Sequence, residues 1–312
     1  MKWANAIRRC IEKSAPKTVI VNVMLVCLLW QSTMLGAQAQ VYPKVAPNVP
    51  YSAVAKLTPS LHASQISYGD LPDQKILFWP GLGEIQNNTL IFIHGGCWLA
   101  QFDIKHSFAL TSALAQRGFD VYSIEYRRTG NGGEWPVALN DIQLAISVIQ
   151  QKLAGDSAVY NAPISIIGHS AGGHLATLAA VNIAPESFTN VHLFGLAPII
   201  DLVAYAEGEN SCQTATPTFM GGTPAQQEQA YKVANPLEYK RLIGASSTAT
   251  TSLKSALMMV GNHDAIVPQN MAQHPSAEFL VIDQAGHFDW IHPGSDAFKQ
   301  LVDKLTVLSS VK

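Results

Sequence analysis

Short apolar runs alternate along this chain with longer stretches that have helical spacing. Residues 137–153 carry apolar side chains at roughly the period of an α-helix and are followed by Gly155, which predicts an amphipathic helix. Residues 171–181 are rich in small side chains and predict a helix that packs closely. A third helix is predicted at 107–116. The apolar runs between these segments predict strands at 89–93, 119–126, 164–167, 191–196, 255–261 and 277–282.

The order of these elements predicts the class of fold. Strands that alternate with helices form right-handed βαβ units, so we expect an α/β protein with a mostly parallel central sheet and helices on both faces. The run at 89–93 is apolar without alternation, as expected for a strand buried on both faces. Two earlier runs, 65–69 and 75–80, are separated by turn residues and predict an opening antiparallel hairpin.

The N-terminal segment has a different pattern. Five basic residues lie within the first 17, an apolar run covers 19–30, and Ala37-Gln38-Ala39 follows. This order is typical of a secretory signal peptide over residues 1–39, cleaved after Ala39, and predicts a secreted or periplasmic protein with no stable membrane insertion after cleavage. An uncleaved membrane anchor is the alternative. Residues 40–64 contain four prolines and predict an irregular arm packed over the main domain, which would occupy 65–312.

Composition narrows the range of partners. Of the 312 residues 48% are hydrophobic and 13% are charged, and the net charge is −2. No basic face for nucleic acid is therefore indicated, and we expect no nucleic-acid partner. The sequence has neither a zinc-ligand spacing nor a glycine-rich nucleotide loop, so neither a metal nor a cofactor is predicted. The oligomeric state is not indicated.

The segment Gly168-His169-Ser170-Ala171-Gly172 follows an apolar strand and precedes a helix. This is the G-x-S-x-G form of a nucleophile elbow, in which glycines give room for a sharp turn that exposes the serine. Taken alone, the motif is as compatible with an ordinary glycine-rich turn as with catalysis.

Three further segments favour catalysis. They are His94-Gly95-Gly96-Cys97-Trp98, Asn262-His263-Asp264 and Gly286-His287-Phe288-Asp289. With the elbow they lie in the order oxyanion loop, nucleophile, acid and base. The sequence thereby resembles the α/β-hydrolase superfamily of serine hydrolases, in particular its esterase/lipase and kynurenine formamidase (arylformamidase) branches. The resemblance implies an α/β-hydrolase fold with a small cap insertion at about 199–250. Within this insertion, we interpret Ser246-Ser247-Thr248 as a solvated loop.

The resemblance also implies roles for individual residues. The catalytic residues would be Ser170, Asp264 and His287. The oxyanion hole would use the N–H groups of Gly95, Gly96 and Ala171. Among the remaining candidates, His94 is expected to brace its loop, Asp289 is the main competitor of Asp264, and His169 and His263 are expected to point away from the site. Tyr126-Arg127-Arg128 is expected to be structural.

Two cysteines would remain after cleavage of the signal peptide, Cys97 and Cys212. They could form one disulfide in an oxidising compartment, but spacing alone does not place their Cα atoms within bonding range. That question stays open at the level of the sequence.

These features predict hydrolysis of carboxylic esters of small molecules through an acyl-enzyme intermediate. The same residues could act on an amide or formamide, so arylformamidase or peptidase activity is the alternative. A signal peptide argues against kynurenine formamidase, whose substrate is intracellular. A catalytically silent binding module is a third interpretation.

Overall fold

We describe a computed structural model of the chain, which covers residues 40–82, 89–155, 162–183, 188–240, 242–243 and 253–310. The described residues belong to the second of the chain's two units, Gln40–Lys312. The predicted signal peptide and its cleavage site, and the loop Ser246-Ser247-Thr248, lie outside the described residues. Within the described part of the chain, no helix has both the length and the hydropathy needed to cross a bilayer.

An eight-stranded sheet forms the centre of the second unit, in the order β1-β2-β4-β3-β5-β6-β7-β8. The first two strands pair antiparallel, β2 pairs antiparallel with β4, and the remaining pairs are parallel. The sheet confirms the predicted hairpin and the mostly parallel arrangement. The strands are β1 (Ser64–Ser67), β2 (Lys75–Trp79), β3 (Thr89–Ile93), β4 (Asp120–Ile124), β5 (Ile164–His169), β6 (Val191–Leu196), β7 (Leu253–Gly261) and β8 (Glu278–Ile282).

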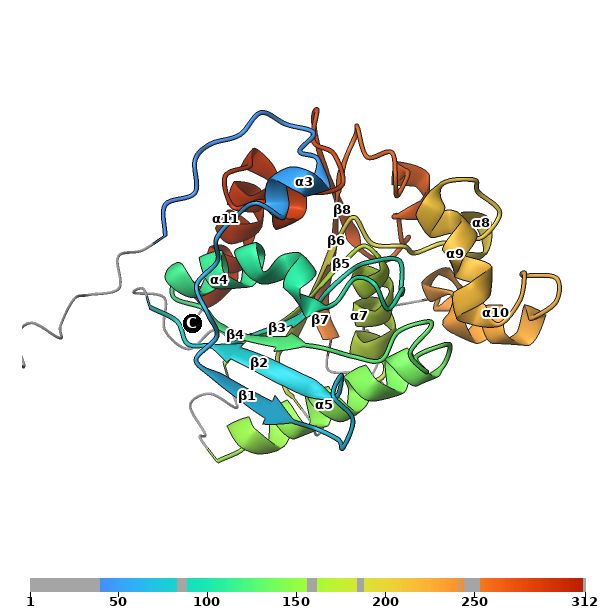
Figure 1. The fold of residues 1–312 in the computed structure, drawn as a ribbon, viewed down its shortest axis with the longest axis horizontal. Coiled ribbons are helices and arrows are strands. Elements are labelled where there is room, and N and C mark those ends of the chain that lie inside the picture. The colour runs from blue at the N-terminus through green and yellow to red at the C-terminus, as the bar shows by residue number, and fades with distance from the viewer. Residues whose placement is uncertain are drawn as a thin grey trace, which may run out of the picture. The chain divides into compact units, whose positions relative to one another are not determined.

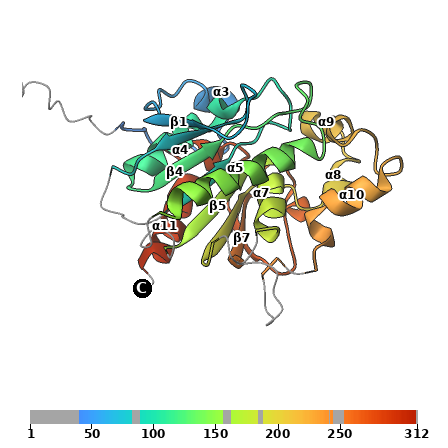
Figure 2. The same ribbon diagram turned by 90° about the horizontal axis from the view of Figure 1, so that it is seen from below.

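Helices cover both faces of the sheet (Figures 1 and 2). One face carries α5 (Val137–Leu153) and α7 (Ala171–Val181), both with the predicted bounds. The other face carries α4 (Phe108–Gln116) and α11 (Asp296–Ser310). Two buried apolar clusters correspond to these faces, and β3 is buried along its whole length between them, as its unbroken apolar run predicts.

A helical cap follows β6, at the position predicted for the insertion. It contains α8 (Leu202–Tyr205), α9 (Ser211–Met220), α10 (Glu228–Ala234) and the 3-10 turn η2 (Pro236–Glu238). The Asn210 side chain accepts hydrogen bonds from the first-turn N–H groups of Cys212 and Gln213, which fixes the start of α9. Gly221 ends the helix with a φ of +77°, which favours glycine.

Three features differ from the expectation or were not predicted. Between Asp264 and His287 the structure has only a 3-10 turn, η3 (Gln269–Met271), and β8, where the spacing had left room for a full helix. The arm contains a short helix, α3 (Tyr51–Val54). The terminal helix α11 was not predicted. One short 3-10 turn, η1 (Ile104–Ser107), precedes α4. Another, η4 (Asp289–Ile291), follows His287.

The topology places one crevice at the carboxyl ends of the strands. The chain passes from β3 to β4 on one side and then returns to β5 on the other side of β3. At such a reversal the loops after the two central strands diverge and leave a space between them. The loop of Gly95 and Gly96 therefore faces the turn of Ser170.

Candidate active site

Ser170 lies at the sharp turn between β5 and α7. Its backbone has φ 57° and ψ −123°, a sparsely populated conformation for a residue with a side chain. A Cβ atom on Gly168 would collide with the carbonyl oxygen of Gly172, and one on Gly172 would collide with the carbonyl oxygens of Ile93 and His94. The two glycines are therefore required by the close approach of chain segments, and the turn has the geometry that the G-x-S-x-G pattern predicts.

The loop after β3 has an unusual backbone over three consecutive residues. Gly96 has φ +113°, Cys97 +53° and Trp98 +57°. A Cβ atom on Gly95 would lie 2.8 Å from the carbonyl oxygen of His169, so this loop runs directly beside the serine turn. Glycine at 95 allows the backbone to approach Ser170 this closely.

His94 braces this loop, as expected. The ring is fully buried, and its nitrogens lie 2.8 Å from the Gly95 carbonyl oxygen and 3.0 Å from Glu125 Oε1. Burial lowers the pKa of His94 to about 3, assisted by the nearby Arg128 guanidinium. The Tyr126 hydroxyl also donates to the His94 carbonyl oxygen, at 2.9 Å.

Glu125 is a buried carboxylate beneath this loop that the sequence analysis did not single out. Its oxygens accept from the N–H groups of Ile104 and Tyr126 and pair with Arg128 Nη1. Next to it, Arg127 forms a two-pronged pair with Asp141, at 2.7 and 2.8 Å. The Tyr-Arg-Arg segment is therefore structural, as expected. A glutamate in a predicted strand was the only available signal for the carboxylate beneath the loop.

Asp264 and His287 meet at the ends of β7 and β8. The Nδ1 atom of His287 lies 2.8 Å from Asp264 Oδ2. The other carboxylate oxygen accepts from the N–H groups of Ile266 and Val267, each at 2.8 Å. A carboxylate can only accept, so Nδ1 carries the hydrogen and Nε2 is left as the acceptor.

The carboxylate of Asp264 is buried, and its pKa has two opposing causes. Burial alone would raise it, but attraction to His287 and the hydrogen bonds from His287, Val267 and Ile266 outweigh burial and hold the pKa of Asp264 below its usual value. The group is therefore ionised at neutral pH.

Asp289, the competing candidate for the acid, has a different environment. Its carboxylate accepts from the N–H groups of Asn48 at 3.2 Å, Val49 at 2.8 Å and Gly286 at 3.0 Å. It thus joins the N-terminal arm to the loop that carries His287. In the structure, the Asp264 carboxylate contacts the His287 ring, and the Asp289 carboxylate contacts the backbone of the arm.

Ser170 and His287 open onto the same cavity, of about 240 Å³. Apolar and aromatic side chains form most of its wall, among them Tyr51 from the arm and Ile266 from the loop that contains Asp264. The sequence analysis did not identify Tyr51, because nothing in the arm predicts where its side chains lie. The lining residues are Tyr51, Gly96, Cys97, Phe102, His106, Ser170, Cys212, Ile266, His287 and Phe288.

Two further histidines lie at this cavity or beside it. His106 lines it, stacks on Tyr51 with ring centroids 5.3 Å apart, and lies 5.4 Å from His169. His169 is buried and its Nε2 lies 3.0 Å from the His287 carbonyl oxygen, so it is closer to the site than expected, whereas His263 is exposed. Burial lowers the pKa of His169 to about 3, and the neighbouring His287 ring adds to this shift.

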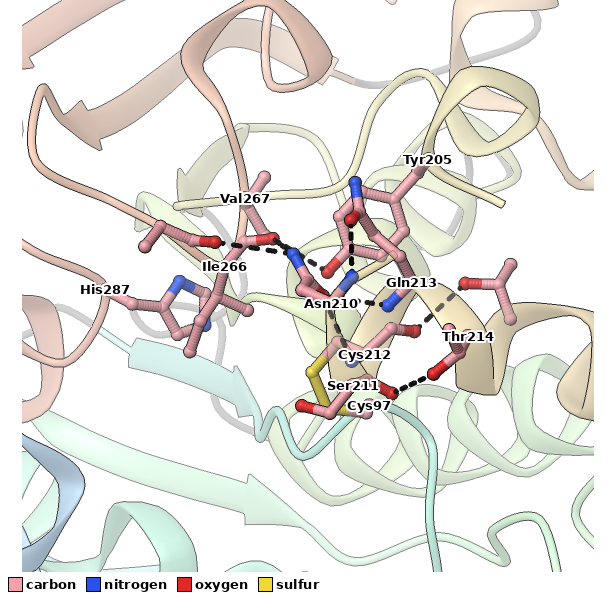
Figure 3. Close-up of a disulfide and its surroundings, with 12 residues drawn as sticks. Cys97, Tyr205, Asn210, Ser211, Cys212, Gln213, Thr214, Ile266, Val267 and His287 are labelled. Carbon is pink, nitrogen blue, oxygen red and sulfur yellow. Dashed lines mark hydrogen bonds between the residues drawn. A yellow bond between two sulfur atoms is a disulfide. The ribbon is translucent and has the colours of Figure 1, made fainter. Parts of the chain in front are cut away.

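The two cysteines form a disulfide, which answers the question that the sequence left open. Cys97 lies in the loop after β3 and Cys212 in the first turn of α9, with Cα atoms 4.9 Å apart (Figure 3). Both residues line the cavity, so the cap and this loop form one covalently linked wall.

An eight-stranded sheet with a serine turn after β5 and an aspartate and histidine after β7 and β8 defines an α/β-hydrolase. The chain belongs to the BD-FAE family, whose model matches residues 77–278.

Individual relatives agree with this assignment. Esterase LipC of Mycobacterium tuberculosis is 32% identical over 126 residues, which cover 39% of this chain and 30% of that protein. Esterase LipQ of the same organism is 32% identical over 97 residues, covering 30% of this chain and 22% of that protein. The chain therefore matches less than a third of the length of these curated relatives.

Solved structures share the fold at lower identity. A truncated carbohydrate esterase from gut microbiota has a TM-score of 0.61 and 20% identity, covering 81% of this chain and 99% of that one. Esterase B from Lactobacillus rhamnosis has a TM-score of 0.62 and 15% identity, covering 92% of this chain and 96% of that one. At these identities the likeness concerns the fold alone.

Proposed function

We propose that this protein is a serine hydrolase that cleaves carboxylic esters with Ser170 as nucleophile, His287 as base and Asp264 as the residue that orients the base. One observation carries the proposal. The Asp264–His287 hydrogen bond of 2.8 Å fixes the ring tautomer, and that ring shares a cavity with a serine held in a strained turn.

Each residue has a defined part in the proposed reaction. The Ser170 hydroxyl attacks the ester carbonyl carbon while His287 Nε2 takes its proton. His287 then gives that proton to the leaving alcohol, and an acyl-enzyme remains. Water attacks this acyl group by the same route and releases the acid. Asp264 stays ionised throughout and stabilises the positively charged ring.

The oxyanion that forms at each step needs N–H donors that are already in place. We assign these to Gly95, Gly96 and Ala171. Ala171 is the first residue of α7, where an N–H group has no carbonyl partner within its own helix. The loop of Gly95 and Gly96 approaches the serine turn from the other side. Fixed donors of this kind stabilise negative charge in the transition state.

The substrate that we propose is a small-molecule ester. Two of the solved structures that share the fold are described as a carbohydrate esterase and a bifunctional GH43-CE protein of Bacteroides eggerthii, which favours an ester carried by a carbohydrate. Aromatic rings line much of the cavity, so an aromatic acyl group such as feruloyl would also be accommodated.

The test is hydrolysis of p-nitrophenyl esters of increasing acyl length, methyl ferulate and an acetylated xylo-oligosaccharide by residues 40–312. Ser170→Ala is expected to lower turnover by roughly a thousandfold or more with the fold retained. Ser165→Ala is the matched control, because it removes from the same strand a buried hydroxyl that has no hydrogen-bond partner among the described residues. Ester turnover that survives in Ser170→Ala contradicts the proposal, and activity on amides alone favours the alternative.

We also propose that residues 1–39 are a secretory signal peptide and that the mature enzyme is secreted or periplasmic. A disulfide beside the serine is compatible with an oxidising compartment. N-terminal sequencing of the protein from the cell exterior or periplasm is expected to begin at Gln40. A cytoplasmic product that retains residues 1–39 contradicts this.

A further inference from the structure

The disulfide joins two parts of the site that the proposed reaction treats separately. Cys97 directly follows Gly95 and Gly96, and Cys212 is the second residue of α9 in the cap. Both cysteines are more than nine-tenths buried, and both line the cavity beside Ser170. The link is therefore part of the site itself.

The loop on the Cys97 side has a backbone that needs external support. Gly96, Cys97 and Trp98 all have positive φ, and for the two residues with side chains this conformation costs free energy. Hydrogen bonds hold the loop at its two ends: the Tyr126 hydroxyl donates to the His94 carbonyl oxygen at 2.9 Å, and the Thr129 N–H donates to the Trp98 carbonyl oxygen at 2.7 Å. Trp98 also stacks on Phe219 of α9, at 4.8 Å between ring centroids. Both the stacking and the disulfide therefore tie the loop to one helix.

The same helix is tied to the loop that carries the acid (Figure 3). The Asn210 side chain that caps α9 donates to the Ile266 carbonyl oxygen at 2.9 Å. The Tyr205 hydroxyl donates to that oxygen at 3.0 Å. The Ile266 N–H in turn donates to Asp264 Oδ1. A continuous path thus runs from Cys97 through α9 to Asp264.

We propose that the Cys97–Cys212 disulfide is a positioning element for catalysis. It holds the Gly95 and Gly96 N–H groups in register with the serine turn and keeps that loop at a fixed position relative to Asp264 and His287. This inference rests on the proposed serine mechanism. Since fixed donors stabilise the transition state more than the bound ester, breaking the link lowers kcat and leaves KM nearly unchanged.

Reduction by a dithiol such as dithiothreitol tests the link without any substitution. The S–S bond breaks, the two cysteines take up two electrons and two protons as thiols, and the dithiol becomes a cyclic disulfide. Ser170, Asp264 and His287 are not chemically changed. Reoxidation of the same sample is expected to restore the original rate.

The variant that isolates the effect is Cys212→Ala, because it breaks the link and leaves every residue of the Gly95–Gly96 loop in place. We expect kcat for a p-nitrophenyl ester to fall about tenfold to a hundredfold, less than the roughly hundredfold or greater loss from removing an oxyanion donor outright. KM should change less than threefold. Labelling of Ser170 by a fluorophosphonate, which forms the same oxyanion geometry, should slow in parallel.

A matched control separates positioning from stability. Leu301→Ala removes a buried side chain of α11, on the opposite face of the sheet, and lowers stability without touching the site. Its kcat is expected to match the wild type at temperatures where circular dichroism reports a folded protein. Cys212→Ala at the same temperatures should remain slow.

The outcomes distinguish the two proposals. A fully reduced, folded protein or Cys212→Ala with kcat and labelling rate within twofold of the oxidised wild type overturns the positioning role and leaves the serine mechanism intact. A rise in KM of about tenfold to hundredfold with unchanged kcat overturns the positioning role as well, since the disulfide would then only shape the cavity. If the oxidised wild type neither turns over an ester nor labels at Ser170, the proposed function itself fails and this inference fails with it.

Discussion

The cavity beside Ser170 has two walls that are held by different chemistry. On one side, the loop of Cys97 is joined to α9 by a disulfide. On the other side, Tyr51 of the arm lies against the cavity, and the arm is attached through the Asp289 carboxylate, which accepts from Asn48, Val49 and Gly286 N–H groups. One wall is held by a covalent bond. The other is held by a buried carboxylate together with further contacts of the arm, among them the hydrogen bond from the Val45 N–H to the Gly294 carbonyl oxygen at 3.1 Å and that from the Ser60 N–H to Ser112 Oγ at 2.9 Å.

The two walls are therefore disrupted by different treatments. A disulfide between distant segments restricts the unfolded chain and resists heat, but a reductant removes it. A buried carboxylate that accepts several N–H groups resists reductants, but it depends on every donor staying in place. His287, the proposed base, lies next to the second wall, and the proposed oxyanion loop lies in the first, so the two halves of the site can be perturbed separately.

The largest expected effect distinguishes the two carboxylates. Asp264→Asn should lower kcat by roughly ten-thousandfold, because an amide no longer fixes the His287 tautomer. Asp289→Asn should lower it far less, since the hydrogen bonds to the Asp289 carboxylate come, among the described residues, from backbone N–H groups of the arm and of the His287 loop. Steady-state kinetics of both variants on one ester is the measurement. Equal losses would mean that the arm and the catalytic residues act as one unit.

The second effect is on stability. Asp289→Asn replaces a charged acceptor of three hydrogen bonds and should lower the free energy of unfolding by about 3 kcal/mol. Urea titration measures this change, and limited proteolysis should release the arm first. Asp283→Asn is the control, because Asp283 is exposed and its side chain bonds only the exposed Asn262 amide among the contacts described. Equal destabilisation by both changes would contradict the anchoring role of Asp289.

A smaller effect tests the arm as a wall of the cavity. The Tyr51 ring packs against His106 and Phe288, with ring centroids 5.3 Å apart in each pair. Tyr51→Ala removes this aromatic wall and should raise KM for a bulky aromatic ester about fivefold to tenfold, or roughly 1 kcal/mol. Tyr51→Phe keeps the ring and should behave as the wild type. Values for p-nitrophenyl acetate should hardly change, since we expect a short acyl group to stay beside Ser170. A uniform change over all esters would place the effect in the catalytic residues instead.

The smallest expected effect is a pH dependence of stability that comes from His174, which contacts the cap. Burial lowers the pKa of His174 to about 4, while its Nε2 donates to the Ala234 carbonyl oxygen at the end of α10. A group whose pKa is lower in the folded protein than its usual 6.5 contributes stability above pH 6.5 and loses it as the pH falls toward 4. The melting temperature should therefore fall over this window. His174→Gln should melt at a lower temperature at pH 7 with a shallower slope, and an unchanged slope would contradict this cause.

Local pattern predicted much of the fold. The bounds of α5 and α7 follow from spacing and side-chain size, which act within a few residues. The pattern of α11 was available too: Phe298, Leu301, Val302 and Leu305 are buried at helical spacing, so this helix could have been predicted. In place of the helix expected between Asp264 and His287 the structure has a 3-10 turn, which lies between Pro268 and Pro275, two residues that have no backbone N–H for a longer helix.

The sequence by itself determined the α/β class and the serine turn, because both depend on neighbouring residues: glycines that allow a strained backbone, and apolar runs long enough for buried strands. It also indicated the candidate catalytic residues. Tertiary structure decided which groups meet. The disulfide, the division of labour between Asp264 and Asp289, and the position of Tyr51 each join segments far apart in the chain. Such distances are set by packing of the whole domain, and no local pattern contains them.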